Sequence, residues 1–88
     1  MVSQTFIITN SVGLHMRPAG VFANAMNQFQ SRITIFFKGS QVDAKSVLNI
    51  MMAGIVCGSE ITLECDGPDE QAALQEAARL IGGGLEYV

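Results

Sequence analysis

The sequence predicts an open-faced α/β sandwich, in which a four-stranded antiparallel sheet carries three helices on one face. The spacing of apolar residues changes along the chain so that the expected elements follow in the order β-α-β-β-α-β-α. The connections between these elements are short, which favours antiparallel strands with all helices on one side. A length of 88 residues fits one domain, residues 1–88, with a single core.

The first strand and the first helix follow from composition and spacing. Residues 5–9 read Thr-Phe-Ile-Ile-Thr, which is rich in β-branched and aromatic residues, and Asn10-Ser11 ends them. Residues 16–29 are expected to form an amphipathic helix. Its buried stripe comprises Ala19, Phe22, Ala23, Met26 and Phe29, opposite Asn24, Asn27 and Gln28.

A hairpin is expected next. Residues 32–37 alternate, with Ile33, Ile35 and Phe37 on one face, and predict a strand. Lys38-Gly39-Ser40 supplies a turn, after which residues 41–44 form a short second arm whose polarity suits a sheet edge.

A helix of about two turns is expected over residues 47–53. Ser46 precedes it, where a hydroxyl can cap the helix, and Gly54 is a natural stop. The helix is apolar on nearly every side, and Ile50 and Ala53 can face the core. Its other apolar residues form a second face: Val47, Leu48 and Met51. We expect a partner to cover this second face.

The last two elements have the clearest patterns. Residues 60–65 alternate strictly and predict a strand whose inward residues are Ile61, Leu63 and Cys65. Residues 70–81 predict a helix that Asp69 caps and Gly82-Gly83-Gly84 stops. Its buried stripe comprises Ala73, Leu74, Ala77, Leu80 and Ile81, and residues 85–88 form a tail.

Composition excludes several classes of function. The net charge is -3 and the five basic residues are scattered, which argues against a nucleic-acid partner. No apolar run is long enough to span a membrane and no secretory signal is evident, so we expect a cytoplasmic protein. Cys57 and Cys65 match neither a metal site nor a disulfide framework, so free thiols are expected, with Cys65 buried. We expect no metal and no cofactor.

The segment 12–20 holds the only histidine of the chain, His15. Gly13 can adopt a backbone conformation that other residues resist, and Pro18 fits the first turn of a helix. His15 therefore lies where a loop becomes a helix, beside unpaired amides and the positive end of the helix dipole. Arg17 adds a permanent charge. This arrangement predicts a site for a phosphate at the imidazole.

Imidazole chemistry suits a phosphoryl carrier. With an ordinary pKa near ~6.5, an accessible imidazole is largely neutral in the cytoplasm and can attack phosphorus. One arginine and a helix end can hold a phosphoryl group without trapping it. The alternative is that His15 is only a helix-start residue satisfied by hydrogen bonds.

The run Gly13-Leu14-His15-Met16-Arg17-Pro18-Ala19 strongly resembles the active-site signature of HPr, the histidine-containing phosphocarrier of the bacterial phosphoenolpyruvate-dependent sugar phosphotransferase system. Ala44-Lys45-Ser46 with the short helix ending at Gly54, and residues 58–63 with Asp66-Gly67, are similar to HPr in place and spacing. The resemblance covers nearly the whole chain. Met16 stands where the family more often has Ala or Thr, and Val12 where a small polar residue is common.

The resemblance implies a stoichiometric carrier rather than an enzyme. Enzyme I, loaded from phosphoenolpyruvate, would phosphorylate His15 at Nδ1, and the group would pass to sugar-specific IIA domains. Arg17 would assist as a cation, and Met16 and Arg17 would bind the phosphate. Ser46 matches the serine that an HPr kinase phosphorylates in many Gram-positive bacteria, where a catabolite-control regulator is a further partner; its alternative role is a plain helix cap.

Five residues resemble the family's partner-docking surface: Met16, Gly20, Val47, Leu48 and Met51. Methionine suits a surface that fits several unrelated partners. The alternative is that these residues belong to the core. The exposed fractions of Leu48 and Met51 distinguish the two possibilities. Two rival functions stay open, a paralogue in a regulatory, nitrogen-type branch and a non-catalytic α/β binding module. We expect a monomer.

Overall fold

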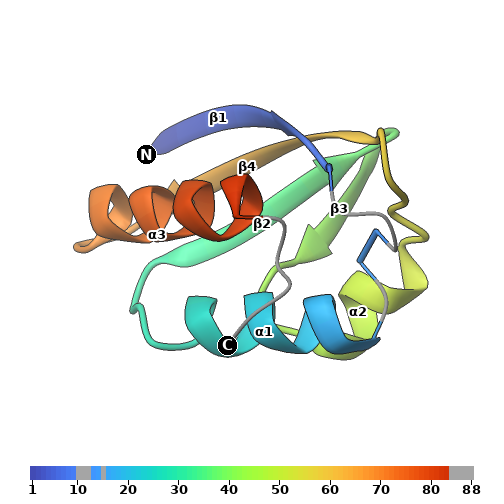
Figure 1. Ribbon diagram of the computed structural model, residues 1–88. Coiled ribbons are helices and arrows are strands. Elements are labelled where there is room, and N and C mark those ends of the chain that lie inside the picture. Colours follow the sequence, from blue (N-terminus) through green and yellow to red (C-terminus); the bar gives the residue numbers. More distant parts are fainter. Residues whose placement is uncertain (10–12, 15, 84–88) are drawn as a thin grey trace.

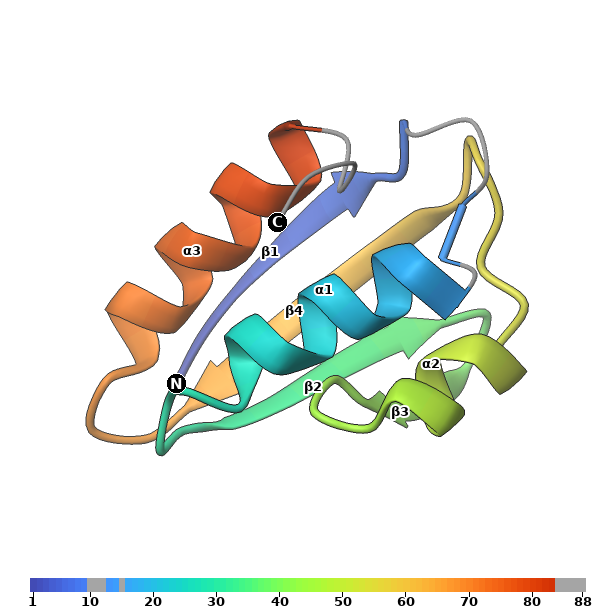
Figure 2. The ribbon, with the colours of Figure 1, turned by 60° about the horizontal axis from the view of Figure 1, so that its bottom comes forward.

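The computed structural model describes residues 1–9, 13–14 and 16–83. In this part of the chain, three helices and a four-stranded sheet form, and the helices lie on one face of the sheet (Figures 1 and 2). The strands are β1 (Val2–Ile7), β2 (Arg32–Phe37), β3 (Ser40–Asp43) and β4 (Glu60–Asp66), and the helices are α1 (Met16–Met26), α2 (Val47–Met52) and α3 (Glu70–Gly82). The sheet order is β1-β4-β2-β3, with every neighbouring pair antiparallel. The predicted fold class and element order are confirmed.

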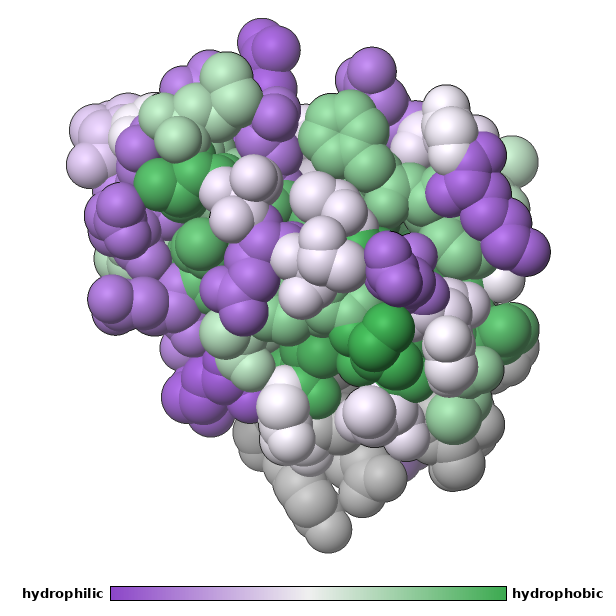
Figure 3. Space-filling view, turned by 90° about the horizontal axis from the view of Figure 1, so that it is seen from above, coloured by the Kyte–Doolittle hydropathy of each residue, from purple (hydrophilic) through white to green (hydrophobic). Residues whose placement is uncertain are grey.

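The core lies between the sheet and the helices. Strand alternation turns Ile33, Ile35, Ile61, Leu63 and Cys65 toward the helices, where each is essentially fully buried. Helices α1 and α3 supply the opposing side chains: Ala19, Phe22, Ala23, Met26, Ala73, Ala77, Leu80 and Ile81. The opposite face of the sheet carries a mixture of hydrophilic and apolar side chains (Figure 3). On it the hydroxyls of Thr5 and Thr62 lie 3.0 Å apart.

Strand β1 begins and ends earlier than predicted, at 2–7 rather than 5–9. Its bounds follow from pairing with β4, which runs from Val2 opposite Cys65 to Ile7 opposite Glu60. Ile8 lies beyond the strand but stays bonded to the segment before β4, because its N–H donates to Ser59 and its carbonyl accepts from Gly58. Composition alone does not reveal such pairing. The predicted break at residues 10–11 lies outside the described residues.

Helix α1 ends at Met26 rather than at the predicted residue 29. After Met26 the backbone tightens, since Gln28 and Phe29 donate to carbonyls only three residues earlier. The Asn27 amide nitrogen donates to the carbonyls of Ala23 and Lys45, 2.8 and 2.9 Å away, which draws the chain toward α2. Phe29 is half-buried and packs against the core from outside the helix.

Asp69 occupies the N-cap position of α3, as the sequence predicts, but its side chain does not cap the helix. Its carboxylate makes no cap hydrogen bond to α3 and instead accepts from the N–H of Gln30 (2.8 Å) and from the N–H and hydroxyl of Ser31 (2.9 and 2.5 Å). The hydroxyl of Ser31, followed by these amides, holds the pKa of Asp69 below its usual range. The side chain thus joins α3 to the segment before β2.

Other bounds differ from prediction by one residue. β3 is Ser40–Asp43, α2 ends at Met52, β4 continues to Asp66, and α3 continues through Gly82 with Gly83 as its C-cap. Gly84 and the predicted tail lie outside the described residues. None of the helices in the described part of the chain is long and apolar enough to cross a membrane.

Candidate functional site

The predicted site lies where α1 begins, and α2 lies beside α1 in both ribbon views (Figures 1 and 2). Hydrogen bonds join the two helical segments at both ends. At one end the N–H of Leu14 donates to the carbonyl of Ile55, 2.9 Å away. At the other, the Lys45 ammonium donates to the carbonyl of Phe29 (2.6 Å), beside the bond from Asn27 to the Lys45 carbonyl. The helices therefore run antiparallel, with the end of α2 near the start of α1.

Helix α1 begins at Met16, directly after position 15. His15 and Val12 lie outside the described residues, so the role of His15 stays a prediction. Met16 and Arg17 occupy the first helical positions, where backbone N–H groups have no acceptor one turn earlier. Both side chains are exposed, and the Arg17 guanidinium forms no ion pair with any described residue. The start of α1 therefore offers two amide donors and a positive charge.

The backbone just before the site is fixed by close contact. Gly13 is buried and has φ +66°, and a Cβ built there would lie 2.6 Å from both the Ile55 carbonyl oxygen and the Val56 Cα. Leu14 is buried in the core. Only glycine combines this dihedral angle with this close approach. The peptide that leads to position 15 thus lies directly against the segment that follows α2.

The exposure of α2 decides between a core role and a surface role for its apolar residues. Leu48 is 64% exposed and Met51 37%, whereas Ile50 is fully buried as predicted. The alternative that Leu48 and Met51 are core is therefore wrong. Val47 is half-buried and packs against the core. Gly20 on α1 is half-buried, and a Cβ built there would meet no atom within 4 Å.

Two exposed apolar residues near this surface were not predicted. Met52 is 75% exposed and Val56 54%, and Met16 is exposed as well. The exposure of Met52 could have been predicted, because α2 is apolar on nearly every side. Val56 lies after the helix, where no periodic pattern of apolar residues indicates which side chains are exposed. We call the set Met16, Leu48, Met51, Met52 and Val56 the exposed apolar surface.

Ser46 caps α2, as predicted. It has extended dihedral angles, φ -109° and ψ 111°, and its hydroxyl oxygen accepts from the N–H of Asn49, 3.2 Å away. Its own N–H donates to the carbonyl of Asp43. Ser46 is half-buried at the edge of the α2 surface.

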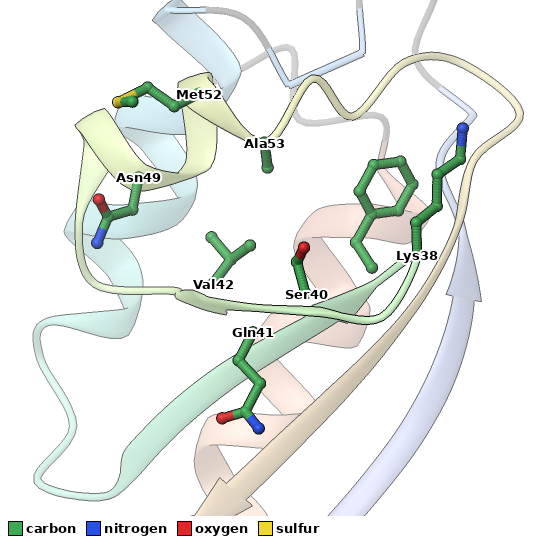
Figure 4. Close-up of a pocket in the computed structure, with 8 residues that line it drawn as sticks. Lys38, Ser40, Gln41, Val42, Asn49, Met52 and Ala53 are labelled. Carbon is green, nitrogen blue, oxygen red and sulfur yellow. The ribbon is translucent and has the colours of Figure 1, made fainter.

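A cavity of about 420 Å³ lies between α2 and the β2–β3 hairpin, and Arg17 is not among the described residues that line it. Figure 4 shows Ser40 and Val42 on the side of β3 that faces α2, while Gln41 points away. Among the described residues that line it, Lys38 is the only ionisable one.

Both cysteines are free thiols, as expected from their spacing. Cys65 is fully buried among the core residues, and burial raises the pKa of its thiol. Cys57 is exposed, and its thiol lies 3.8 Å from the carbonyl oxygen of Thr9.

Comparison with known proteins gives consistent matches along nearly the whole chain. A family model described as "PTS HPr component phosphorylation site" matches residues 2–82. Phosphocarrier protein HPr of Mycoplasma capricolum is 44% identical over 75 residues, 85% of this chain and 84% of that protein. Phosphocarrier protein HPr of Treponema pallidum is 38% identical over 86 residues, 98% of each chain. The solved structure of HPr-C-His from Thermoanaerobacter tengcongensis superposes with a TM-score of 0.95 at 33% identity, covering 100% of this chain and 99% of that one.

Proposed function

Because this chain belongs to the HPr family of phosphocarrier proteins, we propose that it accepts a phosphoryl group on His15 from phosphorylated enzyme I. It then passes the group to sugar-specific IIA domains during phosphoenolpyruvate-dependent sugar uptake in the cytoplasm. The observation that carries this proposal is the start of α1 at Met16, directly after the only histidine of the chain.

The proposed chemistry is transfer rather than hydrolysis. The neutral imidazole Nδ1 of His15 forms a bond to phosphorus as the bond between phosphorus and its donor group on enzyme I breaks. The next acceptor reverses the step, so the chain is a stoichiometric carrier. The amides of Met16 and Arg17, together with the guanidinium, stabilise the anion. A single exposed arginine leaves the loaded state able to release the group.

We further propose that partners dock on the exposed apolar surface together with Gly20 and Val47. Leu48 and the methionines provide apolar area that is already exposed to solvent. Methionine side chains adapt to partners of different shape. Gly20 leaves open space beside them, so a partner can approach the backbone of α1 closely.

Ser46 is proposed as a regulatory phosphorylation site for an HPr kinase, with a catabolite-control regulator as a further partner. A phosphate there lies at the amino end of α2, where negative charge is favourable, so the fold should change little. Its position next to Val47 and Leu48 places the charge at the proposed docking surface. The proposal fails if a Ser46→Asp protein accepts phosphate from enzyme I as fast as wild type.

The central test is incubation with phosphoenolpyruvate and enzyme I, followed by mass measurement. The expected product carries one acid-labile phosphoryl group, and the His15→Ala protein carries none. A wild-type chain that stays unmodified under conditions that load a known HPr would overturn the carrier proposal and favour a non-catalytic binding module.

A second comparison addresses the regulatory alternative. The loaded chain is offered to a sugar-specific IIA domain and to a nitrogen-type IIA domain in parallel, and the rate of phosphoryl loss is measured for each. Faster transfer to the sugar-specific domain is expected. Faster transfer to the nitrogen-type domain would reassign the chain to the regulatory branch.

A further inference from the structure

Two reciprocal side-chain hydrogen bonds join the carboxyl end of α1 to the segment that leads into α2. The Asn27 amide nitrogen donates to the Lys45 carbonyl, 2.9 Å away. In return, the Lys45 ammonium donates to the Phe29 carbonyl, 2.6 Å away. Each segment thus supplies one side-chain donor and one main-chain acceptor. We call this pair of hydrogen bonds the Asn27–Lys45 clasp.

Both sides of the clasp are held by further hydrogen bonds. The Asn27 amide nitrogen also donates to the carbonyl of Ala23, one turn earlier in α1, at 2.8 Å. On the other side, the N–H of Lys45 donates to the carboxylate of Asp43, the last residue of β3, at 3.0 Å. The clasp therefore attaches the end of α1 to a segment that is itself bound to the sheet.

The clasp lies close in sequence to the proposed docking surface on both helices. Gly20 precedes Asn27 by seven residues, nearly two helical turns, so the two lie on one side of α1. On the other side of the clasp, Val47 and Leu48 follow Lys45 by two and three residues. The clasp therefore connects the part of this surface on α1 with the part on α2.

We infer that Asn27 and Lys45 are positioning residues for the proposed docking surface. This surface spans both helices, so its shape depends on how α1 and α2 are placed relative to each other. The hydrogen bond between Leu14 and Ile55 fixes the two segments at one end, and the clasp fixes them at the other. Without the clasp the helices sample more than one arrangement, and only a fraction of the molecules is ready to bind. The effect on binding rests on the proposed function, whereas the effect on helix placement does not.

The test removes the two hydrogen bonds separately and together. Asn27→Ala removes the amide, Lys45→Met removes the ammonium but keeps an unbranched side chain, and Lys45→Arg keeps a charged donor. Gln28→Ala is the control for Asn27, because Gln28 is exposed and makes no side-chain hydrogen bond with a described residue. Lys38→Met is the control for charge, because Lys38 is exposed on the β2–β3 hairpin and its loss changes the net charge equally.

Two readouts separate helix placement from binding. Residual dipolar couplings of the backbone amides give the angle between α1 and α2 in the folded chain without any partner. Phosphorylation by enzyme I at several concentrations of the chain gives the half-maximal concentration and the maximal rate. Unfolding curves identify a temperature at which every variant is folded.

Asn27→Ala and Lys45→Met should each change the angle between the helices. Each should also raise the half-maximal concentration by roughly threefold to tenfold, with an unchanged maximal rate. The effects should add incompletely in the double variant, because both hydrogen bonds restrain the same two segments. Lys45→Arg and the two controls should match wild type.

The wild-type angle in both single variants would overturn the inference. Fully additive effects on the half-maximal concentration would also overturn it, since they indicate that the two side chains contact enzyme I independently. A wild type that accepts no phosphate refutes the proposed function alone, and the dipolar couplings then decide the positioning role.

Discussion

A Cβ atom on residue 13 would lie 2.6 Å from the Cα of Val56, a distance that such atoms do not reach without movement of the backbone. The close approach comes from φ +66° at Gly13 and from the hydrogen bond between the next residue, Leu14, and Ile55. The glycine that begins the histidine signature is therefore required by a contact with the other half of the chain.

We predict that Gly13→Ala destabilises the fold more than Gly39→Ala does. Gly39 also has a positive φ, +81°, but a Cβ there meets nothing within 4 Å, so this variant measures the cost of the dihedral angle alone. The added clash should lower the free energy of unfolding by at least ~1 kcal/mol beyond that cost. Urea unfolding of both proteins provides the measurement, and equal losses would contradict the role of the contact.

Leu48→Ala should leave stability within about 0.5 kcal/mol of wild type, because the side chain is mostly exposed. It should raise the concentration of chain needed for half-maximal phosphorylation by enzyme I. Ile7→Ala is the control, since Ile7 is 49% exposed but lies on β1. Steady-state phosphorylation assays compare the two, and an equal change in both variants would argue against docking on α2.

Substitutions of Ser46 can separate its role as the cap of α2 from its proposed role as a regulatory phosphorylation site. Ser46→Ala removes the acceptor for the Asn49 N–H and should lower stability by about 1 kcal/mol. Ser46→Asp and Ser46→Asn both keep a good cap and should retain stability, but only the aspartate should slow phosphorylation of His15. Thermal unfolding and phosphorylation rates test this directly. An equally slow asparagine variant would show that charge is not the cause.

The two cysteines should differ strongly in the rate at which their thiols react. Cys57 is exposed, whereas Cys65 is fully buried with its pKa raised by burial. A disulfide reagent should therefore modify one thiol in the folded chain and two in denaturant. Cys57→Ser should remove the fast reaction entirely, and any remaining fast thiol in that variant would show that the core opens at Cys65.

Acid should weaken the link between Asp69 and Ser31. The pKa of Asp69 is lower in the folded chain than in the unfolded chain, so the unfolded state binds the proton first as the pH falls. The contribution of Asp69 is complete above its ordinary pKa and is lost as the pH falls through the lower pKa of the folded state. Asp69→Asn should thus be less stable than wild type at pH 7 and lose less stability on acidification. Urea unfolding at pH 7 and at acidic pH tests this, and parallel pH profiles would refute it.

Local sequence signals predicted the elements well because those signals act over a few residues. The alternation of residues 60–65 identified β4, and the position of Ser46 identified the cap of α2. Contacts between distant residues could not be predicted in this way. The placement of β1 beside β4 fixes the bounds of β1, and Asp69 bonds to Ser31, 38 residues earlier. For the same reason the hydrogen bonds that residues 55–59 form with Ile8 and Leu14 were not predicted.

Residues 55–59 contact Ile8 and Leu14 through hydrogen bonds between peptide groups. Val56 and Cys57 are exposed, and the Cys57 thiol lies 3.8 Å from the carbonyl oxygen of Thr9. Sequence change at position 56 can therefore alter the proposed docking surface while these main-chain hydrogen bonds persist.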